Sequence, residues 1–207
     1  MNLSNIRMTA QQFDPVSQSN IRVGSKHGNK STHAEVSAEL TRELSKSSPA
    51  ALNITSISYQ RAEIFRGAEM SQKYPALILS DVISVGVGGV DTQRLTAPIR
   101  VRSSFPQVNG SSLSLVDKAF QDVNESVLNT PGSYMVGDTR FKTEMKCVYW
   151  NGEKSRWLTD GCRTVVKSDD GGGEDGSTSV TCECYHMTHF SVILVSCSTL
   201  LLLGLFN

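Results

Sequence analysis

The apolar residues of the chain recur with two different periods, which predict one helix followed by a long β region. Residues 33–48 carry apolar side chains at helical spacings between good helix formers, so we expect an amphipathic helix there. Its apolar positions are Ala34, Val36, Leu40 and Leu44. Residues 49–196 instead carry short β-type runs bounded by Gly, Pro, Asn or Asp, which predict a β domain of layered sheets.

Six runs carry this strand pattern. They are LNITSISY (52–59), ALILSDVISVGVGGV (76–90), APIRVRSSF (97–105), TEMKCVYW (143–150), RWLTDGCRTVVKS (156–168) and STSVTCECYHMTHFSVILVS (177–196). The last three runs predict three or four strands in sequence. The fold class expected from the pattern is mainly β.

Three other segments lack the strand pattern. Residues 1–32 are polar without a sustained period, so we interpret them as a disordered linker. Residues 113–128 repeat apolar positions on one side and predict a helical excursion. The acidic, Gly-rich segment 168–179 is interpreted as a mobile hairpin loop, because its carboxylates do not fall at the positions that an EF-hand calcium loop needs.

Charge and motif content exclude several classes of protein. Lys plus Arg and Asp plus Glu number 20 each, so the net charge is zero and nothing favours nucleic acid. The sequence has no Gly-rich phosphate loop and no acid and base pair for an external substrate. We therefore expect no turnover enzyme, no cofactor and no nucleic-acid partner.

The cysteines indicate cross-links in an oxidising compartment. Four of the five, Cys147, Cys162, Cys182 and Cys184, lie in the last part of the chain, and the first 146 residues contain none. Five glycosylation sequons support an extracellular setting; they begin at Asn2, Asn29, Asn53, Asn109 and Asn124.

Both ends of the chain suggest a fragment of a longer protein. The N-terminus has no basic residue followed by an apolar run, so it does not resemble a signal peptide. Residues 190–206 are nearly all apolar, slightly fewer than the roughly 20 residues of a spanning helix. We interpret 197–207 as the start of a membrane segment, in which Cys197 is a buried thiol.

Three submotifs follow one another near the C-terminus. They read Cys147-x-x-Trp150, then Trp157-x-x-x-Gly161-Cys162, then Cys182-x-Cys184-x-His186-Met187-Thr188-x-Phe190. In this order they resemble the GPS element of adhesion-type seven-helix receptors and polycystin-like proteins. The match covers residues 147–196, and a weaker likeness to the surrounding GAIN-B β-sandwich extends back through LTAPIRVRSSF and VISVGVGGV.

The resemblance implies a disulfide pattern that the residues alone leave open. Four cysteines allow three connectivities. By resemblance Cys147 pairs with Cys182, and Cys162 pairs with Cys184. Each bridge stabilises by about 2 to 4 kcal/mol and would hold the segment before Thr188 rigid.

The resemblance also implies that the chain cuts its own backbone between Met187 and Thr188. The hydroxyl of Thr188 would attack the preceding carbonyl carbon, with His186 as general base, and water would hydrolyse the resulting ester. If the segment is an extended strand, His186 and Thr188 face the same side of it. His189 is a second candidate base. The family usually has Leu where this chain has Met187, a residue of similar volume.

A competing interpretation of the same residues is a zinc site. Cys162, Cys182, Cys184 and His186 are suitable ligand types, but Cys-x-Cys-x-His lacks the Cys-x-x-Cys knuckle of most structural zinc sites. We assign Trp150, Trp157 and Phe190 to packing, because aromatic side chains bury large apolar surfaces.

The function implied by the resemblance is that of an extracellular domain at the plasma membrane. The strand after the cut, THFSVILVS, is apolar on both faces, so it would stay in the sheet as a tethered agonist. The partners would be the two cleavage fragments, a membrane at the C-terminus and an extracellular ligand. The alternatives are a non-cleaving adhesion module and a zinc-stabilised protein.

Overall fold

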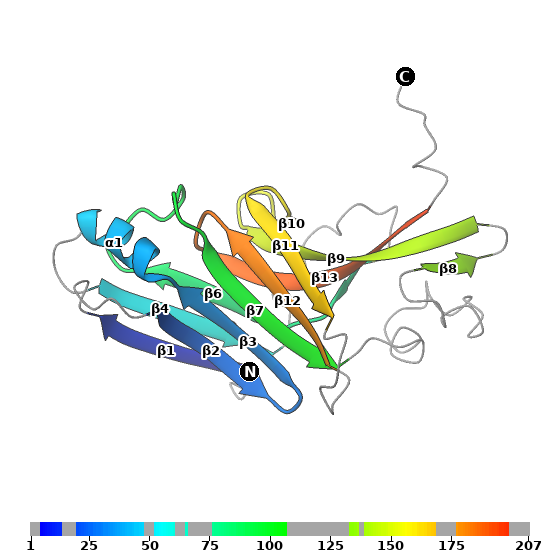
Figure 1. The fold of residues 1–207 in the computed structure, drawn as a ribbon, viewed down its shortest axis with the longest axis horizontal. Helices are drawn as coiled ribbons and strands as arrows, with labels where there is room; N and C mark the ends of the chain where they lie inside the picture. Colours follow the sequence, from blue (N-terminus) through cyan, green and yellow to red (C-terminus); the bar gives the residue numbers. More distant parts are fainter. Residues whose placement is uncertain are drawn as a thin grey trace, which may run out of the picture.

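Two antiparallel β-sheets face each other and enclose the core of the domain (Figure 1). The computed structural model describes residues 5–13, 20–47, 52–60, 65, 76–106, 133–136, 139–168 and 177–198. Within these residues the chain is mainly β-strand, with one short helix at one end of the sandwich. The predicted mainly β antiparallel sandwich with a short N-terminal helix is therefore confirmed.

The larger sheet, sheet A, holds the C-terminal strand at its centre. Its main path, in spatial order, is β1 (Ile6–Phe13), β4 (Leu52–Tyr59), β6 (Val82–Val87), β13 (His189–Ser198), β9 (Thr139–Asn151) and β10 (Arg156–Leu158). Two further strands, β5 (Ala76–Ile78) and β8 (Ser133–Val136), pair with β13 and β9.

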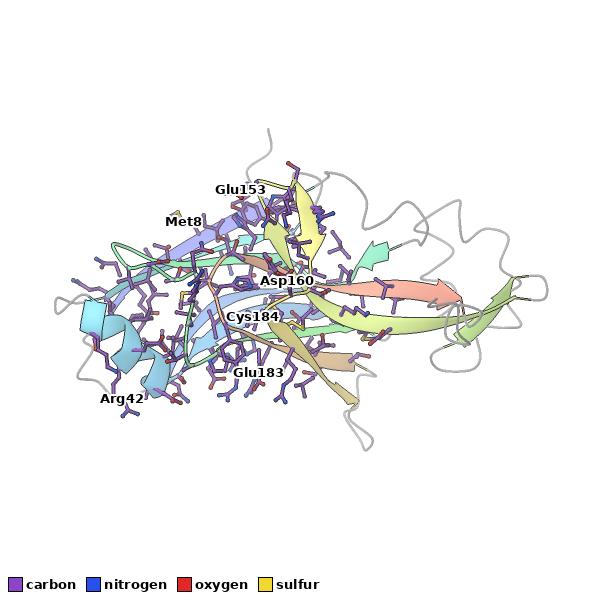
Figure 2. The ribbon with its side chains drawn as sticks, turned by 90° about the horizontal axis from the view of Figure 1, so that it is seen from above. Met8, Arg42, Glu153, Asp160, Glu183 and Cys184 are labelled. Carbon is purple, nitrogen blue, oxygen red and sulfur yellow. A yellow bond between two sulfur atoms is a disulfide. The ribbon has the colours of Figure 1, made fainter. Side chains whose placement is uncertain are left out.

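The smaller sheet, sheet B, lies against sheet A and holds the two closely spaced cysteines. Its strands in spatial order are β11 (Cys162–Ser168), β12 (Ser177–Cys184), β7 (Ile99–Pro106), β3 (Lys30–Val36) and β2 (Ile21–His27). Seen from above, the two sheets form separate layers (Figure 2). The chain passes directly from β12 in sheet B to β13 in sheet A.

The linker expected over residues 1–32 is wrong, because this part of the chain contributes β1, β2 and the start of β3. In β2 and β3 the buried positions alternate with outward polar ones, and several inward residues are small or polar, such as Ser25, Thr32 and Ala34. Sheet A covers them from the other side of the core, as the buried contact between the hydroxyls of Ser25 in β2 and Ser58 in β4 shows. A count of large apolar residues therefore missed these strands.

The helix is shorter than the predicted 33–48, since α1 spans Ala38–Ser47. Residues 33–36 are the end of β3, where Ala34 and Val36 fit a period of two as well as a helical one. Ser37 stops the strand and caps the helix, because its hydroxyl accepts a hydrogen bond from the amide of Leu40 at 3.2 Å. Leu40 and Leu44 face the core as predicted.

The strand after the expected cut is central and buried on both faces, as its sequence predicted. Phe190, Val192 and Leu194 belong to the core between the sheets. Ile193 faces the opposite side, in an outer cluster that also contains Phe65, Val82, Val148 and Trp157. Burial of each large side chain stabilises by about 1.5 to 3 kcal/mol.

Several expected segments lie at the end of the last strand or outside the described residues. Residues 197 and 198, which we assigned to a membrane segment, belong to β13. The helical excursion at 113–128, the centre of the Gly-rich loop (169–176) and residues 199–207 lie outside the described residues. Among the helices of the described part, none is long and apolar enough to cross a membrane.

The helix is tied to the loop 88–98, which joins β6 to β7, by one carboxylate. Glu43 accepts hydrogen bonds from the amide of Thr96 at 2.8 Å and from the amide of Ala97 at 3.0 Å. Burial works to raise the pKa of Glu43, but these hydrogen bonds, with the charge of Lys46, hold it below its usual value. The carboxylate is therefore ionised in the folded domain at neutral pH.

We expect Glu43→Ala to lower the free energy of unfolding by about 1 kcal/mol, because two backbone amides lose their acceptor. Since the folded pKa is depressed, this contribution is present at neutral pH and is lost as the pH falls through that pKa. Chemical denaturation at two pH values measures both effects. Glu39→Ala, an exposed glutamate of the same helix, is the control, and equal losses for the two variants would contradict the assignment.

Candidate functional site

Residues 185–188 connect the two sheets in a bent segment between β12 and β13. Tyr185, His186 and Thr188 are bends and Met187 has no regular structure. The prediction that His186 and Thr188 share one face of an extended strand is therefore wrong. The chain must turn here because its next strand belongs to the opposite sheet.

Backbone hydrogen bonds hold the front of this segment. The amide of Tyr185 donates to the carbonyl of Gly161 at 3.0 Å, and the carbonyl of Tyr185 accepts from the amide of Leu95 at 2.8 Å. Leu95 lies in the loop 88–98 that Glu43 holds. The turn after β10 and the loop after β6 thus fix the entry to the crossing from two sides.

Two more backbone bonds flank the peptide bond between Met187 and Thr188. The amide of Met187 donates to the carbonyl of Thr92 at 3.0 Å, and the carbonyl of Thr188 accepts from the amide of Val85 at 3.0 Å. The side chain of Met187 is 4% exposed and belongs to the core. Both residues of this peptide bond are therefore fixed in position by neighbours distant in sequence.

Two disulfides cross-link the strands that lead into the crossing. Cys147 of β9 bonds to Cys182 of β12 and so joins sheet A to sheet B. Cys162 of β11 bonds to Cys184, the last residue of β12, which lies directly opposite it in the strand register. This is the pairing that the resemblance implied. The four sulfurs are bonded to one another and are not available as thiolate ligands for zinc.

His186 packs into an aromatic wall. Its ring lies 4.4 Å from the ring of Tyr149 and 5.5 Å from that of Phe190, measured between centroids. Its Nε2 atom is 4.0 Å from the sulfur of Cys162. Burial lowers the pKa of His186, and the charge of Asp160 opposes this shift. At neutral pH the imidazole is neutral and can accept a proton.

Thr188 contacts the other histidine. Its Oγ1 atom lies 3.5 Å from Nδ1 of His189 and 3.5 Å from the carbonyl oxygen of Trp150. Burial lowers the pKa of His189 as well. Between the described residues His186 and Thr188 there is no hydrogen bond. The structure therefore brings both imidazoles to the segment but places only His189 against the hydroxyl.

The carbonyl oxygen of Met187 is the atom that would carry negative charge if Thr188 attacked it. Within the described ranges, no hydrogen bond to this oxygen is formed. The Thr188 hydroxyl is directed toward the Trp150 carbonyl and His189 instead. The arrangement holds the peptide bond and its neighbours in place.

The assigned packing aromatics lie on both sides of sheet A. Phe190 is fully buried between the sheets, whereas Trp157 is buried in the outer cluster. Trp150 packs edge-on against Trp157 at 5.4 Å and against Phe65 at 5.7 Å. Phe65 also contacts the ring of His189 at 5.2 Å. No pattern in the sequence pointed to Phe65, because it is a single aromatic residue in a polar stretch.

The described residues contain no group of three or more His, Cys, Asp or Glu side chains placed to hold a metal ion. The donors that the zinc interpretation needed are engaged elsewhere, three as disulfide sulfurs and His186 in its aromatic contacts. The chemistry that remains at the crossing is that of one hydroxyl and two neutral imidazoles beside a fixed peptide bond.

Comparison with known proteins identifies the family of the chain. The family described as "GPS: GAIN subdomain B" matches residues 1–198, most of the 207-residue chain. The chain therefore belongs to this family. The resemblance carried by the three cysteine and tryptophan submotifs is confirmed, and the match also includes the N-terminal strands that we had interpreted as a linker.

A curated relative points to the same class of protein. An adhesion G protein-coupled receptor of Homo sapiens is 32% identical over 63 residues, which are 30% of this chain and 12% of the relative. The chain thus matches about an eighth of that receptor's length. The activity of the whole receptor is therefore attributed to this chain only as a proposal.

Gly161 is the glycine that the site requires. Its backbone has a φ of +76°, and a Cβ atom added there would lie 3.2 Å from Cδ2 of His186. A side chain would therefore strain the backbone and also displace the imidazole.

We expect Gly161→Ala to lower the free energy of unfolding by about 2 kcal/mol, more than either of two control substitutions. Gly89 has a φ of +74° and open space, so Gly89→Ala measures the backbone strain alone. Gly152→Ala, at a position with neither feature, should change little. Chemical denaturation measures all three, and equal losses at positions 161 and 89 would show that the His186 contact costs nothing.

Proposed function

We propose that this domain cuts its own backbone between Met187 and Thr188 and keeps the C-terminal fragment bound as part of an adhesion-receptor-type membrane protein. The observation that carries the proposal is the bent crossing at 185–188, fixed by backbone bonds on both sides and placed beside neutral imidazoles. Family membership supports it, since the family match covers residues 1–198 and so includes this peptide bond.

The proposed reaction is an N-to-O acyl shift followed by hydrolysis. The base takes the proton of the Thr188 hydroxyl, and Oγ1 attacks the carbonyl carbon of Met187. The bond from that carbon to the Thr188 nitrogen breaks as the nitrogen gains a proton, which leaves an ester. Water then cleaves the ester to a carboxylate on Met187 and the restored hydroxyl of Thr188, whose amine was already freed by the shift. The reaction happens once per chain and has no external substrate.

After cleavage, β13 would remain in place. It pairs with β9 along its length and with β6 and β5 on its other side. Its apolar side chains are buried on both faces, so separation of the fragments requires loss of a central strand. This supports the proposal that the strand acts as a tethered agonist-like peptide, released only when the rest of the domain is removed.

We place the domain on the extracellular face of the plasma membrane. Two disulfides are typical of an oxidising compartment. Two of the sequon asparagines, Asn29 and Asn53, are exposed and could accept glycans. The remaining sequons, at Asn2, Asn109 and Asn124, lie outside the described residues. Under this proposal the partners are an extracellular ligand and the membrane.

A second candidate function is a GPS-bearing adhesion module that does not cleave. Two observations favour it: His186 makes no hydrogen bond to Thr188, and no described donor reaches the carbonyl oxygen of Met187. In such a protein the disulfides and aromatic clusters would serve rigidity alone.

The Thr188→Ala variant distinguishes these two functions. We expect the secreted wild-type chain, reduced and deglycosylated, to give two fragments meeting at Met187 and Thr188 on a denaturing gel, and to elute as one species under native conditions. Thr188→Ala should give one intact chain with unchanged thermal stability, because only the nucleophile is lost. Thr188→Ser is the matched control and should still cleave.

An intact wild-type chain would identify the non-cleaving module. Cleavage that persists in Thr188→Ala would remove Thr188 from the reaction. Intact-mass measurement of both fragments identifies the bond that is cut in either case.

The base is tested by the pH dependence of cleavage during refolding. We propose His186, as the family pattern indicates, because hydrogen-bond geometry before the reaction does not by itself exclude a base. Burial lowers the pKa of both histidines, so we expect the rate to rise with pH and to level off below about 6.5, the ordinary histidine pKa. The neutral ring is the active form, and it is lost as the pH falls through the lowered pKa.

His186→Ala should slow cleavage about 100-fold or more, and His189→Ala should slow it much less. The two variants remove imidazoles of similar burial, so each controls for the other. The reverse result would assign the base to His189, whose Nδ1 atom contacts the hydroxyl. Rates are measured by quenching refolding reactions into denaturant and separating the fragments.

A further inference from the structure

The outer face of sheet B carries an excess of positive charge. Along its strands the inward residues are buried and apolar or small, whereas the outward ones are polar, so the face is set by the strand period. The charged side chains that the structure describes on this face are Arg22, Lys26, Glu35, Arg100, Arg102, Arg163 and Glu183. Five cations and two anions leave a local net charge of +3 on a chain whose total charge is zero.

The strand register arranges these charges in a row across the sheet. Arg163 lies opposite Glu183, Glu183 opposite Arg100, Arg100 opposite Glu35, and Glu35 opposite Arg22. The arginines therefore lie on every second strand. Because neighbouring strands are about 4.8 Å apart, successive arginines are about 10 Å apart along a straight line.

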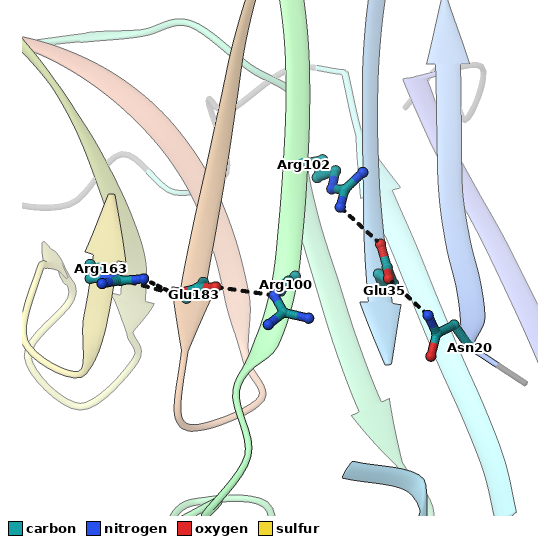
Figure 3. A network of polar contacts seen from close by, with 6 residues as sticks. All are labelled: Asn20, Glu35, Arg100, Arg102, Arg163 and Glu183. Carbon is teal, nitrogen blue, oxygen red and sulfur yellow. Dashed lines mark hydrogen bonds and ion pairs between the residues drawn. The ribbon is translucent and has the colours of Figure 1, made fainter. Parts of the chain in front are cut away.

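The carboxylates lie deeper than the guanidinium groups and hold them in place. Glu183 accepts from Arg163 at 2.7 Å and from Arg100 at 3.1 Å (Figure 3). The side chain of Glu183 is 16% exposed, whereas those of Arg163 and Arg100 are 73% and 41% exposed. The surface that a partner meets is therefore the set of guanidinium groups, already oriented by the glutamate below them.

A second arrangement of the same kind lies beside the first. Arg102 pairs with Glu35 at 3.5 Å (Figure 3). Arg22 donates to Nδ1 of His33 at 3.1 Å. His33 lies between the two arginines, and burial together with their charges lowers its pKa to about 4. The histidine is neutral at physiological pH. The positive charges of Arg22 and Arg102 are thus balanced only in part, by the single carboxylate of Glu35.

No described element covers this face, and its chemistry does not suit a buried protein interface. The exposed large apolar residues of the described chain are Ile6, Met8 and Tyr185, and none of them lies in a strand of sheet B. Tight protein interfaces are centred on aromatic or aliphatic anchors, which this flat face lacks. Guanidinium groups instead match sulfate and phosphate oxygens through paired hydrogen bonds.

We propose that the outer face of sheet B binds a sulfated polysaccharide chain, which lies along the row of Arg163, Arg100 and Arg22 and also places a sulfate group on Arg102, beside the row on β7. A linear polymer with repeated anionic groups complements cations in a line about 10 Å apart. The proposal rests on the extracellular placement given above and is independent of cleavage, because it uses no residue of the crossing segment.

The test uses the secreted full-length chain with Thr188→Ala, so that every molecule is intact, and heparin as the probe. We expect binding at about 0.15 M salt that weakens steeply as the salt is raised, as for other polyanion sites. Arg22→Gln with Arg102→Gln should weaken binding about tenfold or more, because two charge-assisted contacts to sulfate are lost. Neither arginine takes part in the Glu183 network, so the sheet should remain intact.

The matched control is Arg7→Gln with Arg156→Gln, which removes two exposed arginines from strands of sheet A. It should change the affinity less than about twofold by the same measurement, since surface charges elsewhere contribute little. Thermal unfolding of both double variants checks that the fold is retained.

Two outcomes overturn the proposal: no heparin binding, whether or not phosphatidylserine vesicles bind, and equal losses in the two double variants. Chemically desulfated heparin should not bind. None of these results depends on the cleavage assay, so a failed polysaccharide site and a failed cleavage proposal are told apart.

Discussion

The chain has to leave sheet B at Cys184 and enter the centre of sheet A at His189, and the intervening residues 185–188 have no strand partner of their own. Both ends of this crossing are fixed. One end is bonded through Cys184 to β11, and the other continues into a strand buried on both faces. Between them, the backbone is held by the loop 88–98 and by β6. A bent peptide segment can persist in such a place because contacts with the surrounding elements fix its backbone conformation.

The disulfides act on the crossing from two directions. Cys147 and Cys182 set the separation of the two sheets where β9 and β12 face each other, whereas Cys162 and Cys184 fix the end of β12 within sheet B. The alternate spacing of Cys182 and Cys184 on one strand does not lead to one partner strand, because Cys162 lies in sheet B and Cys147 in sheet A. Each disulfide thus limits a different movement of residues 185–188.

The two outer faces of the sandwich have opposite chemistry. On sheet A, Phe65, Trp150 and Trp157 form an aromatic layer that buries β13 from outside and places His189 in an apolar environment. On sheet B, the outward positions are charged and hydrophilic, and paired glutamates hold arginines at the surface. Helix α1 covers neither of these faces and instead closes one end of the sandwich (Figure 1).

Local pattern was enough to predict most strands from residue 52 onward and the burial of the last strand on both faces. These features follow from periodicity and spacing, which a single chain carries. The strands β1, β2 and β3 could not be predicted, because small residues such as Ser25 and Thr32 become buried only when other strands cover them. Packing of the whole chain determined that residues 185–188 bend, that His189 rather than His186 contacts Thr188, and that Phe65 joins the site. Those outcomes depend on which sheet the next strand enters, and a change of sheet leaves no periodic pattern in the residues that make it.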